Sequence, residues 1–84
     1  MKNKVLIELI VPEIDMKFNI YVPINKRIGN IINLLGKAVK ELSNGCYEYT
    51  NKTSIYNSLT GEKYPINSLL RETNIRNGSK IVLI

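Results

Sequence analysis

The sequence has no histidine and only one cysteine, and both shortages limit the chemistry that it can carry. Histidine is the commonest general base and metal ligand, so its absence removes the usual centre of a hydrolase or a zinc site. Cys46 cannot form an internal disulfide, which fits a reducing compartment, although a bridge between two chains stays open. Because no histidine can activate Cys46 and a predicted helix ends just before it, we interpret it as a partly buried apolar side chain.

The other polar residues form no recognisable catalytic or ligand-binding motif. Glu13 and Asp15 are two carboxylates in one loop, which is fewer than a calcium loop needs. Gly61 and Gly78 are isolated, so they do not form a phosphate-binding loop. None of the five serines has a recognisable base partner or nucleophile-elbow spacing: Ser43, Ser54, Ser58, Ser68 and Ser79. We therefore expect no enzymatic activity, no metal site and no cofactor.

Long apolar runs are also lacking. No segment approaches the ~18 consecutive apolar residues of a membrane-spanning helix. The start of the chain has basic residues and then an apolar run, but Glu8 interrupts the run and no small-residue cleavage site follows. The composition, 44% hydrophobic and 23% charged, is that of an ordinary globular protein, and 84 residues suffice for one core. We expect a single cytoplasmic domain over residues 1–84, without membrane insertion.

What the sequence does contain begins with two apolar stretches that predict a β-hairpin. Residues 4–11 and 16–23 are rich in branched and aromatic side chains, and four residues separate them. If Val11 pairs with Met16, the residue numbers of all partners sum to 27, and one face is apolar on both strands. A slip by one residue would turn this apolar set toward water, so the register is well specified.

The hydrophobic period then changes to that of a helix. Apolar residues at positions 28, 31, 32, 35, 38, 39 and 42 predict a helix with one buried face. Asn25 is the predicted cap, and Asn44 with Gly45 is the predicted end. Gly29 and Gly36 lie on one edge of this helix. Either a partner approaches closely there, or the helix tolerates two unfavourable residues because packing holds it.

The rest of the chain predicts further strands. Residues 54–66 alternate and turn at Thr60-Gly61, which indicates a third strand and a short fourth, and one helical turn follows around Leu69 and Leu70. A turn at Asn77-Gly78 precedes a closing apolar strand, residues 80–84.

This order of elements predicts an α+β protein of the β-grasp class. We expect a mixed sheet of four to five strands, with the first and last strands parallel in its middle and one helix packed across one face. A central position for residues 80–84 would explain why every one of them after Lys80 is apolar.

The layout, the Val22-Pro23 pair before the helix and the ending NIRNGSKIVLI resemble ubiquitin-like proteins. More closely, the segment NIYVPINKRIGNIINLLGKAVKEL with that ending resembles the YukD-like proteins (YukD/EsaB type), ubiquitin-like accessory proteins of type VII secretion systems in Gram-positive bacteria. The resemblance implies a non-catalytic protein-interaction module in an accessory or regulatory role, with other proteins, among them secretion-system components, as partners.

Two departures from ubiquitin itself bear on function. Relatives that are conjugated or carry sulfur need a flexible extension that ends in Gly-Gly, whereas this sequence has Ile84 at the end of a strand, so we expect no conjugation. Ubiquitin's recognition face uses exposed aliphatic residues on the third strand. The corresponding positions here are Tyr56 and Ser58, so we do not expect ubiquitin receptors to bind.

The sheet face away from the helix is the first candidate binding surface. In the register above it carries Leu6, Ile10, Tyr21 and Val82, and we expect Leu6, Tyr21 and Val82 to be contiguous. An aromatic beside aliphatic residues with a charged rim is typical of a protein interface, and homodimerisation through this face is one version. The alternative is that these residues are present for strand propensity alone.

A second candidate surface is basic. The formal charge is +5, and Lys26, Arg27, Lys37 and Lys40 are expected near the solvent side of the helix. They could meet an acidic partner or a phosphate backbone, so the alternative function is a small basic nucleic-acid-binding domain. No aromatic platform accompanies them, which argues against nucleic acid and for an ordinary solvated helix face.

Overall fold

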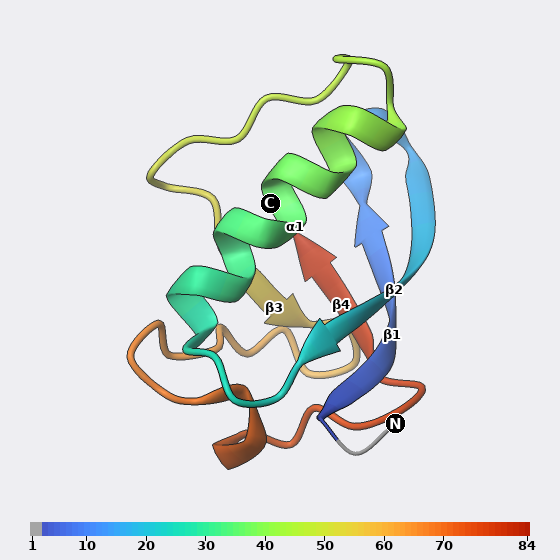
Figure 1. Cartoon of the computed structure of the whole chain (residues 1–84). Coiled ribbons are helices and arrows are strands. Elements are labelled where there is room, and N and C mark those ends of the chain that lie inside the picture. The colour runs from blue at the N-terminus through green and yellow to red at the C-terminus, as the bar shows by residue number, and fades with distance from the viewer. Residues whose placement is uncertain (1–2) are drawn as a thin grey trace.

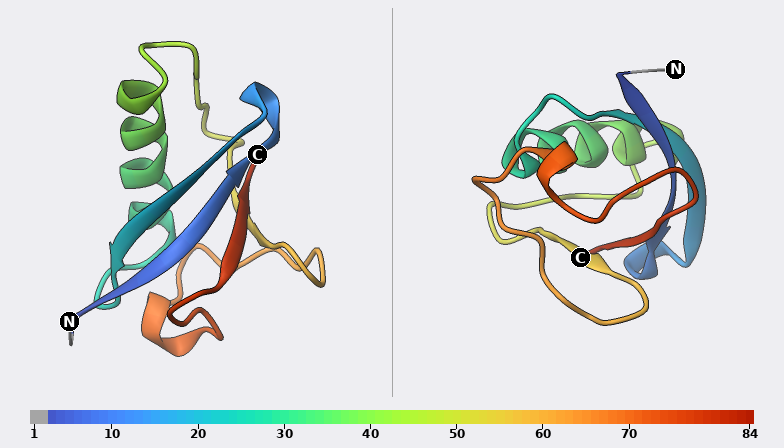
Figure 2. Two further views of the ribbon diagram at one scale, coloured as in Figure 1. Left: turned by 90° about the vertical axis from the view of Figure 1, so that its right-hand side faces the viewer. Right: turned by 90° about the horizontal axis from the view of Figure 1, so that it is seen from below.

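In a computed structural model, residues 3–84 form a sheet of four strands with one helix across one of its faces (Figure 1). The strand order is β2-β1-β4-β3; β1 and β4 are parallel, and the other two pairings are antiparallel. Figure 2 shows the helix on one side of the sheet only. The elements are β1 (Lys4–Val11), β2 (Met16–Pro23), α1 (Ile28–Leu42), β3 (Ile55–Asn57) and β4 (Lys80–Leu83), with 3₁₀ turns at Pro12–Ile14 and Leu70–Glu72. The predicted β-grasp, with its first and last strands parallel in the middle, is confirmed.

The hairpin has the predicted register. All eight pairs from Lys4 with Pro23 to Val11 with Met16 are formed, and their numbers sum to 27. The loop closes by a 3₁₀ turn in which Asp15, at φ 52°, donates its N–H to the Pro12 carbonyl at 3.1 Å. The alternation of buried and outward residues along β1 therefore continues into β2 without a bulge.

The core lies between α1 and the inner face of the sheet. The parallel pairing of β1 and β4 places alternate apolar residues of both central strands under the helix. Phe18 and Ile20 on the outer strand β2 are half-buried and pack against this core. The residues that fill the centre are at most 2% exposed: Ile7, Leu9, Val11, Ile31, Leu35, Val39, Ile81 and Leu83.

The helix does not start as predicted. Arg27 is its N-cap and makes no side-chain capping bond, while the Asn25 side chain accepts a hydrogen bond from Arg71 Nη1 at 2.6 Å. The first N–H groups of the helix bind main-chain carbonyls from a distant segment: Ile28 binds Ser68 at 2.8 Å and Gly29 binds Ile66 at 3.0 Å. Because helix N–H groups left without partners are costly, residues 66–68 replace the side-chain cap.

The predicted end of the helix is confirmed. Helix α1 stops at Leu42, and Asn44 and Gly45 follow with φ angles of 55° and 81°. The Gly45 N–H donates to the Lys40 carbonyl at 2.8 Å, as expected where a left-handed residue closes a helix.

Both helix glycines are covered by other parts of the chain. A Cβ atom added to Gly36 would lie 2.5 Å from Cγ of Tyr49, so the tyrosine ring rests directly on the helix backbone. A Cβ atom on Gly29 would lie 3.4 Å from the Ile66 carbonyl oxygen, which is a tighter than average but tolerable contact. The close approach considered from the sequence therefore occurs, and the approaching segments belong to the same chain.

Two local predictions are wrong. Cys46 is exposed rather than partly buried, because the extended chain after α1 turns its neighbour Tyr47 into the core instead, where it is 2% exposed. The short fourth strand after Gly61 is reduced to a single bridge between Tyr56 and Lys63. Among residues 3–84 the sheet therefore has four strands, at the lower end of the expected range.

Candidate protein-interaction surface

The sheet face away from the helix carries two separate apolar groups. Tyr21 lies opposite Leu6 across β1 and β2, and these two residues are called the Tyr21 group. Val82 lies between Ile10 on β1 and Tyr56 on β3, and these three are called the Val82 group. Tyr21 is 53% exposed, whereas its four companions are half-buried by their neighbours.

The expected contiguity of Leu6, Tyr21 and Val82 is therefore wrong. The parallel register pairs Val82 with Ile10, four residues along β1 from Leu6, which corresponds to roughly 13 Å. A polar row crosses the sheet between the two groups and consists of Asn19, Glu8 and Lys80. Glu8 and Lys80 face each other on neighbouring strands, an arrangement of opposite charges that favours this register.

Leu59 is an exposed apolar residue that the sequence analysis missed. Its side chain is 89% exposed at the tip of the loop after β3. The loop is held by the Asn57 side chain, whose Oδ1 accepts the N–H groups of Leu59 at 2.8 Å and Thr60 at 3.1 Å. Asn57, three residues before the Thr60-Gly61 pair, was the signal for such a turn. Leu59 lines a hollow of about 230 Å³ together with Gly78, Ser79 and Lys80.

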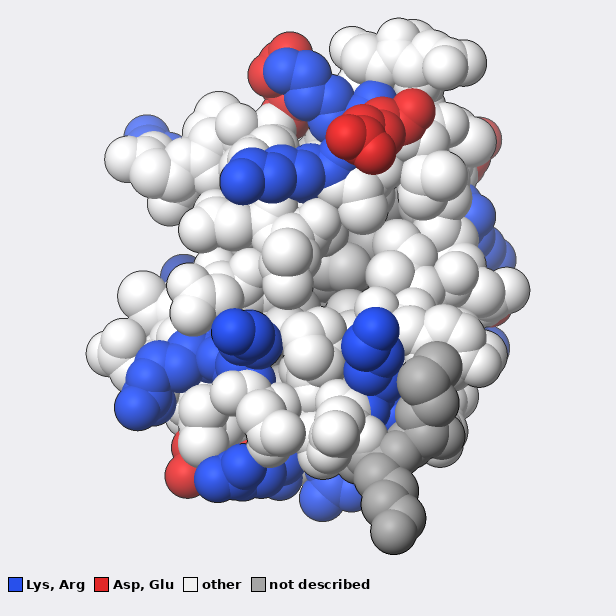
Figure 3. Space-filling view, in the orientation of Figure 1, with Lys and Arg blue, Asp and Glu red and all other residues white. Residues whose placement is uncertain are grey.

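The four predicted basic residues do not form one patch. Lys26 and Arg27 precede α1, whereas Lys37 and Lys40 lie in its second half, so Arg27 and Lys40 are roughly 20 Å apart along the helix axis. Figure 3, which views the molecule with α1 toward the reader, shows Lys and Arg side chains gathered at the top and at the bottom, with uncharged surface in the centre between them.

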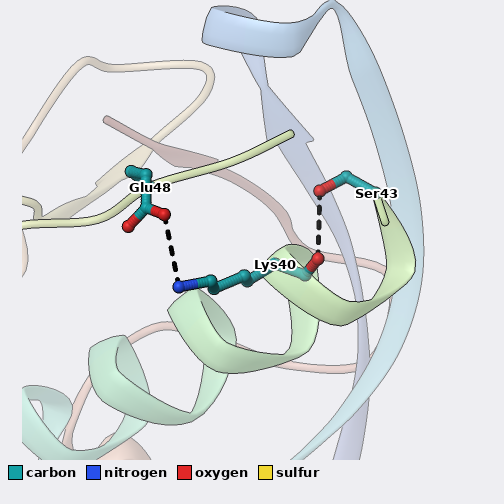
Figure 4. A network of polar contacts seen from close by, with 3 residues as sticks. All are labelled: Lys40, Ser43 and Glu48. Carbon is teal, nitrogen blue, oxygen red and sulfur yellow. Dashed lines mark hydrogen bonds and ion pairs between the residues drawn. The ribbon is translucent and has the colours of Figure 1, made fainter. Parts of the chain in front are cut away.

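Two of these four basic side chains also have partners within the chain. Arg27 Nη1 donates to the Asn67 carbonyl. Lys40 Nζ lies 3.2 Å from Glu48 Oε1, and the Lys40 carbonyl accepts a hydrogen bond from Ser43 Oγ at 3.3 Å (Figure 4). A continuous phosphate-binding track over these residues is not formed.

A polar hollow beside the loop after β3 is built around the Tyr64 hydroxyl. This hydroxyl donates to Asn74 Oδ1 at 2.8 Å and accepts from Asn57 Nδ2 at 3.2 Å, in a hollow of about 290 Å³ that Glu72 also lines. Burial raises the pKa of Tyr64 above its usual value, and the nearby Glu62 carboxylate raises it further. These two hydrogen bonds connect the end of β3 with the loop that precedes β4.

Metal-ligand clusters and membrane-spanning helices were both considered from the sequence, and residues 3–84 lack each of them. Within this range, no three Cys, Asp or Glu side chains lie close enough together to hold a metal ion. None of the helices in the same range has the length and apolar character needed to cross a membrane.

Solved structures that share this architecture include two mycobacterial EccD domains. The ubiquitin-like domain of EccD5 from Mycobacterium xenopi matches with a TM-score of 0.78 and 16% identity, over 96% of this chain and 92% of that one. The ubiquitin-like domain of the type VII secretion system protein EccD1 from Mycobacterium tuberculosis matches with a TM-score of 0.76 and 10% identity, over 96% and 97%. The chain has a ubiquitin-like fold. In this ubiquitin-like fold, the Tyr21 and Val82 groups occupy the open face of the sheet.

The ubiquitin-like fold also occurs in proteins with other roles. A chain of the toluene 4-monooxygenase HD complex matches with a TM-score of 0.78 and 8% identity, over 95% of each chain. No protein-family model and no curated protein matches the sequence. At identities this low the likeness establishes the fold, and function has to be argued from the surface.

Proposed function

We propose that this chain is a non-catalytic, cytoplasmic protein-interaction module that acts as an accessory or regulatory component of a type VII secretion system. The observation that carries the proposal is the match over 96% of the chain to ubiquitin-like domains of two secretion proteins. The YukD-like pattern of residues 19–42 and of the closing segment supports the same function.

The Tyr21 and Val82 groups are the proposed contact surface for a protein partner. Tyr21 is aromatic, more than half exposed and held on a regular strand, so it can bury a large area at little cost in conformational entropy. The polar row of Asn19, Glu8 and Lys80 between the groups supplies the directional contacts that fix a partner's orientation.

The module is proposed to act by binding other proteins, without being conjugated to them. The Ile84 N–H donates to the Ser54 carbonyl at 3.1 Å, and the Ser54 N–H donates to the Ile84 carbonyl at 2.7 Å. These two bonds pair the Ile84 backbone with the residue that precedes β3, so residue 84 is part of the same sheet as the proposed contact surface.

Co-purification with the secretion machine from the cells of origin tests this function. The wild-type chain should co-purify with a membrane component of the machine, and replacing Tyr21 and Val82 with lysine should abolish this because two charges enter the contact surface. Both side chains point away from the core, so the circular dichroism spectrum should not change. Leu42→Lys is the matched control, because Leu42 is 56% exposed at the far end of α1.

The possible failures separate two claims. If the doubly substituted chain still binds, the contact surface is wrong. If the wild-type chain binds no component of an intact secretion machine, the proposed function is wrong.

A further inference from the structure

Strand β2 is an edge strand whose outer side has no partner among residues 3–84. It is the first strand in the order β2-β1-β4-β3, it is eight residues long, and it lies at the outer side of the sheet (Figure 1). Apart from its ladder with β1, no main-chain hydrogen bond to residues 17–21 occurs in this range. A long edge of this kind is a template for pairing with another strand.

Alternate residues of a strand direct their hydrogen bonds to opposite sides, and this shows which N–H and C=O groups of β2 point away from β1. On β1 the Leu6 carbonyl accepts from Gly78 at 2.8 Å, and the Glu8 N–H donates to Ser79 at 2.9 Å, so even-numbered residues of β1 face the β4 side. Odd-numbered residues of β1 must then bind β2, and the register pairs them with even-numbered residues. The N–H and C=O groups of Lys17, Asn19 and Tyr21 therefore point away from the sheet.

The usual protections of an edge strand are weak in β2. Its pairing with β1 runs without a bulge, its only proline is Pro23 at the end, and Lys17 is its only charged residue. On the helix side, Met16 is 41% exposed and Phe18 and Ile20 are only half-buried. An apolar strip is thus left partly uncovered beside the unpaired edge.

We propose that β2 pairs antiparallel with β2 of a second copy of this chain, about a two-fold axis at Asn19, so that two four-stranded sheets become one. In this register Asn19 faces Asn19, and Lys17 of each copy faces Tyr21 of the other. Three outward residues on each copy then supply six main-chain hydrogen bonds. This interface differs from a dimer formed through the open sheet face, and it goes beyond the proposed function.

The neighbouring registers are poorer for reasons visible in the chain. Shifting the register of the two β2 strands by two residues in one direction would pair Tyr21 with Asp15, whose φ of 52° is not that of a strand. A shift by two in the other direction would pair Lys17 with Pro23, which has no N–H to donate. An axis at Lys17 would place the two lysines opposite each other, which is destabilising.

The side chains are also self-complementary in the proposed register. On the helix side, Phe18 faces Ile20 and Met16 faces Val22, so every cross-strand pair is apolar and the uncovered strip of each copy covers that of the other. On the open side, each Lys17 ammonium lies beside the Tyr21 ring of the second copy, a combination suited to a cation–π contact. Thus both faces of the edge favour a second copy of the same strand.

Charge substitutions at position 21 test this pairing, with analytical ultracentrifugation over a concentration series as the readout. Tyr21→Lys should weaken the dimer roughly tenfold, because two pairs of like charges appear in each dimer. Tyr21→Glu should preserve or strengthen it, because each Glu faces Lys17 of the other copy. Combining Tyr21→Lys with Lys17→Glu should restore it.

A backbone test is independent of these charges. Asn19→Pro removes the outward N–H of Asn19 in both copies while leaving the β1 ladder intact, so the dimer should be lost, whereas Asn19→Ala should retain it. Circular dichroism checks that each variant is folded. The inference is overturned if the wild-type chain stays monomeric up to about 1 mM, or if Tyr21→Lys and Tyr21→Glu weaken the dimer equally. Neither result depends on binding a secretion component, so this inference and the proposed function fail separately.

Discussion

Replacing Gly36 with alanine should destabilise the protein, although alanine is the better helix former. The substitution lies in the interior of α1, where the change from Gly to Ala by itself stabilises a helix by about 1 kcal/mol. Against this, the new Cβ would lie 2.5 to 2.8 Å from three atoms of the Tyr49 ring. The nearest of these is Cγ, the ring atom bonded to Cβ of Tyr49. Rotation of the ring about the Cβ–Cγ bond does not move Cγ, so it cannot relieve this contact.

The net change in stability is the cost of overpacking against Tyr49 minus the gain in helix propensity. Overpacking of this kind costs about 1–3 kcal/mol, so the net effect of Gly36→Ala should be a loss of roughly 0 to 2 kcal/mol. In a Tyr49→Ala background the ring is absent, and the same substitution should then stabilise by about 1 kcal/mol. The sign of the effect should therefore reverse between the two backgrounds.

Urea unfolding followed by circular dichroism measures all four proteins of this cycle. The coupling free energy between positions 36 and 49 should be about 1–3 kcal/mol. Gly29→Ala is the matched control, because its Cβ would meet only Ile66, whose carbonyl oxygen and Cβ lie 3.4 and 3.8 Å away, and it should be neutral or stabilising. Equal stabilisation by Gly36→Ala in both backgrounds would refute the contact between the ring and the helix.

Two further predictions concern polar contacts. Asn77→Ala should cost about 1 kcal/mol in urea unfolding, because the Leu6 N–H loses its 2.8 Å bond to Asn77 Oδ1; an unchanged midpoint would contradict this. Since burial raises the pKa of Tyr64, the folded protein keeps a proton that the unfolded chain has lost above about pH 10, so stability should fall as pH rises through that range. Urea midpoints between pH 9 and 11 should fall more steeply for the wild type than for Tyr64→Phe, and equal slopes would contradict the assignment.

The hairpin was predictable because its information is local. A four-residue loop and the alternation of apolar and polar residues over positions 16–20 leave one register in which Leu9 meets Phe18 and Ile7 meets Ile20 on the buried side. The helix end was predictable for the same reason, since Asn44 and Gly45 adopt left-handed conformations more readily than other residues.

The start of the helix depends on residues far away in the sequence. Asn25 has the composition of a cap, but Ile66 and Ser68 supply carbonyls to the first turn across about forty residues. No pattern near Asn25 reveals this competition, which only tertiary packing decides.

The layout of the candidate surface could be predicted only within the hairpin. The pairing of Tyr21 with Leu6 follows from the loop, and it is confirmed. The position of Val82 depends on the parallel register of β1 and β4, which no short turn fixes, because β4 enters the sheet only after a long crossover. Whether these residues bind a partner stays a prediction for the experiments above.

The parallel pairing of β1 with β4 also affects how the protein is made. Residues 4–11 leave the ribosome well before residues 80–83, so β1 has only β2 beside it until β4 has been synthesised and has passed through the exit tunnel. Until then β1 lacks one of its two neighbouring strands, and β3 has no strand to pair with. Insertion of β4 then supplies the missing neighbour of β1 and the partner of β3 in the same step, so the hairpin and β3 become one sheet only late in synthesis.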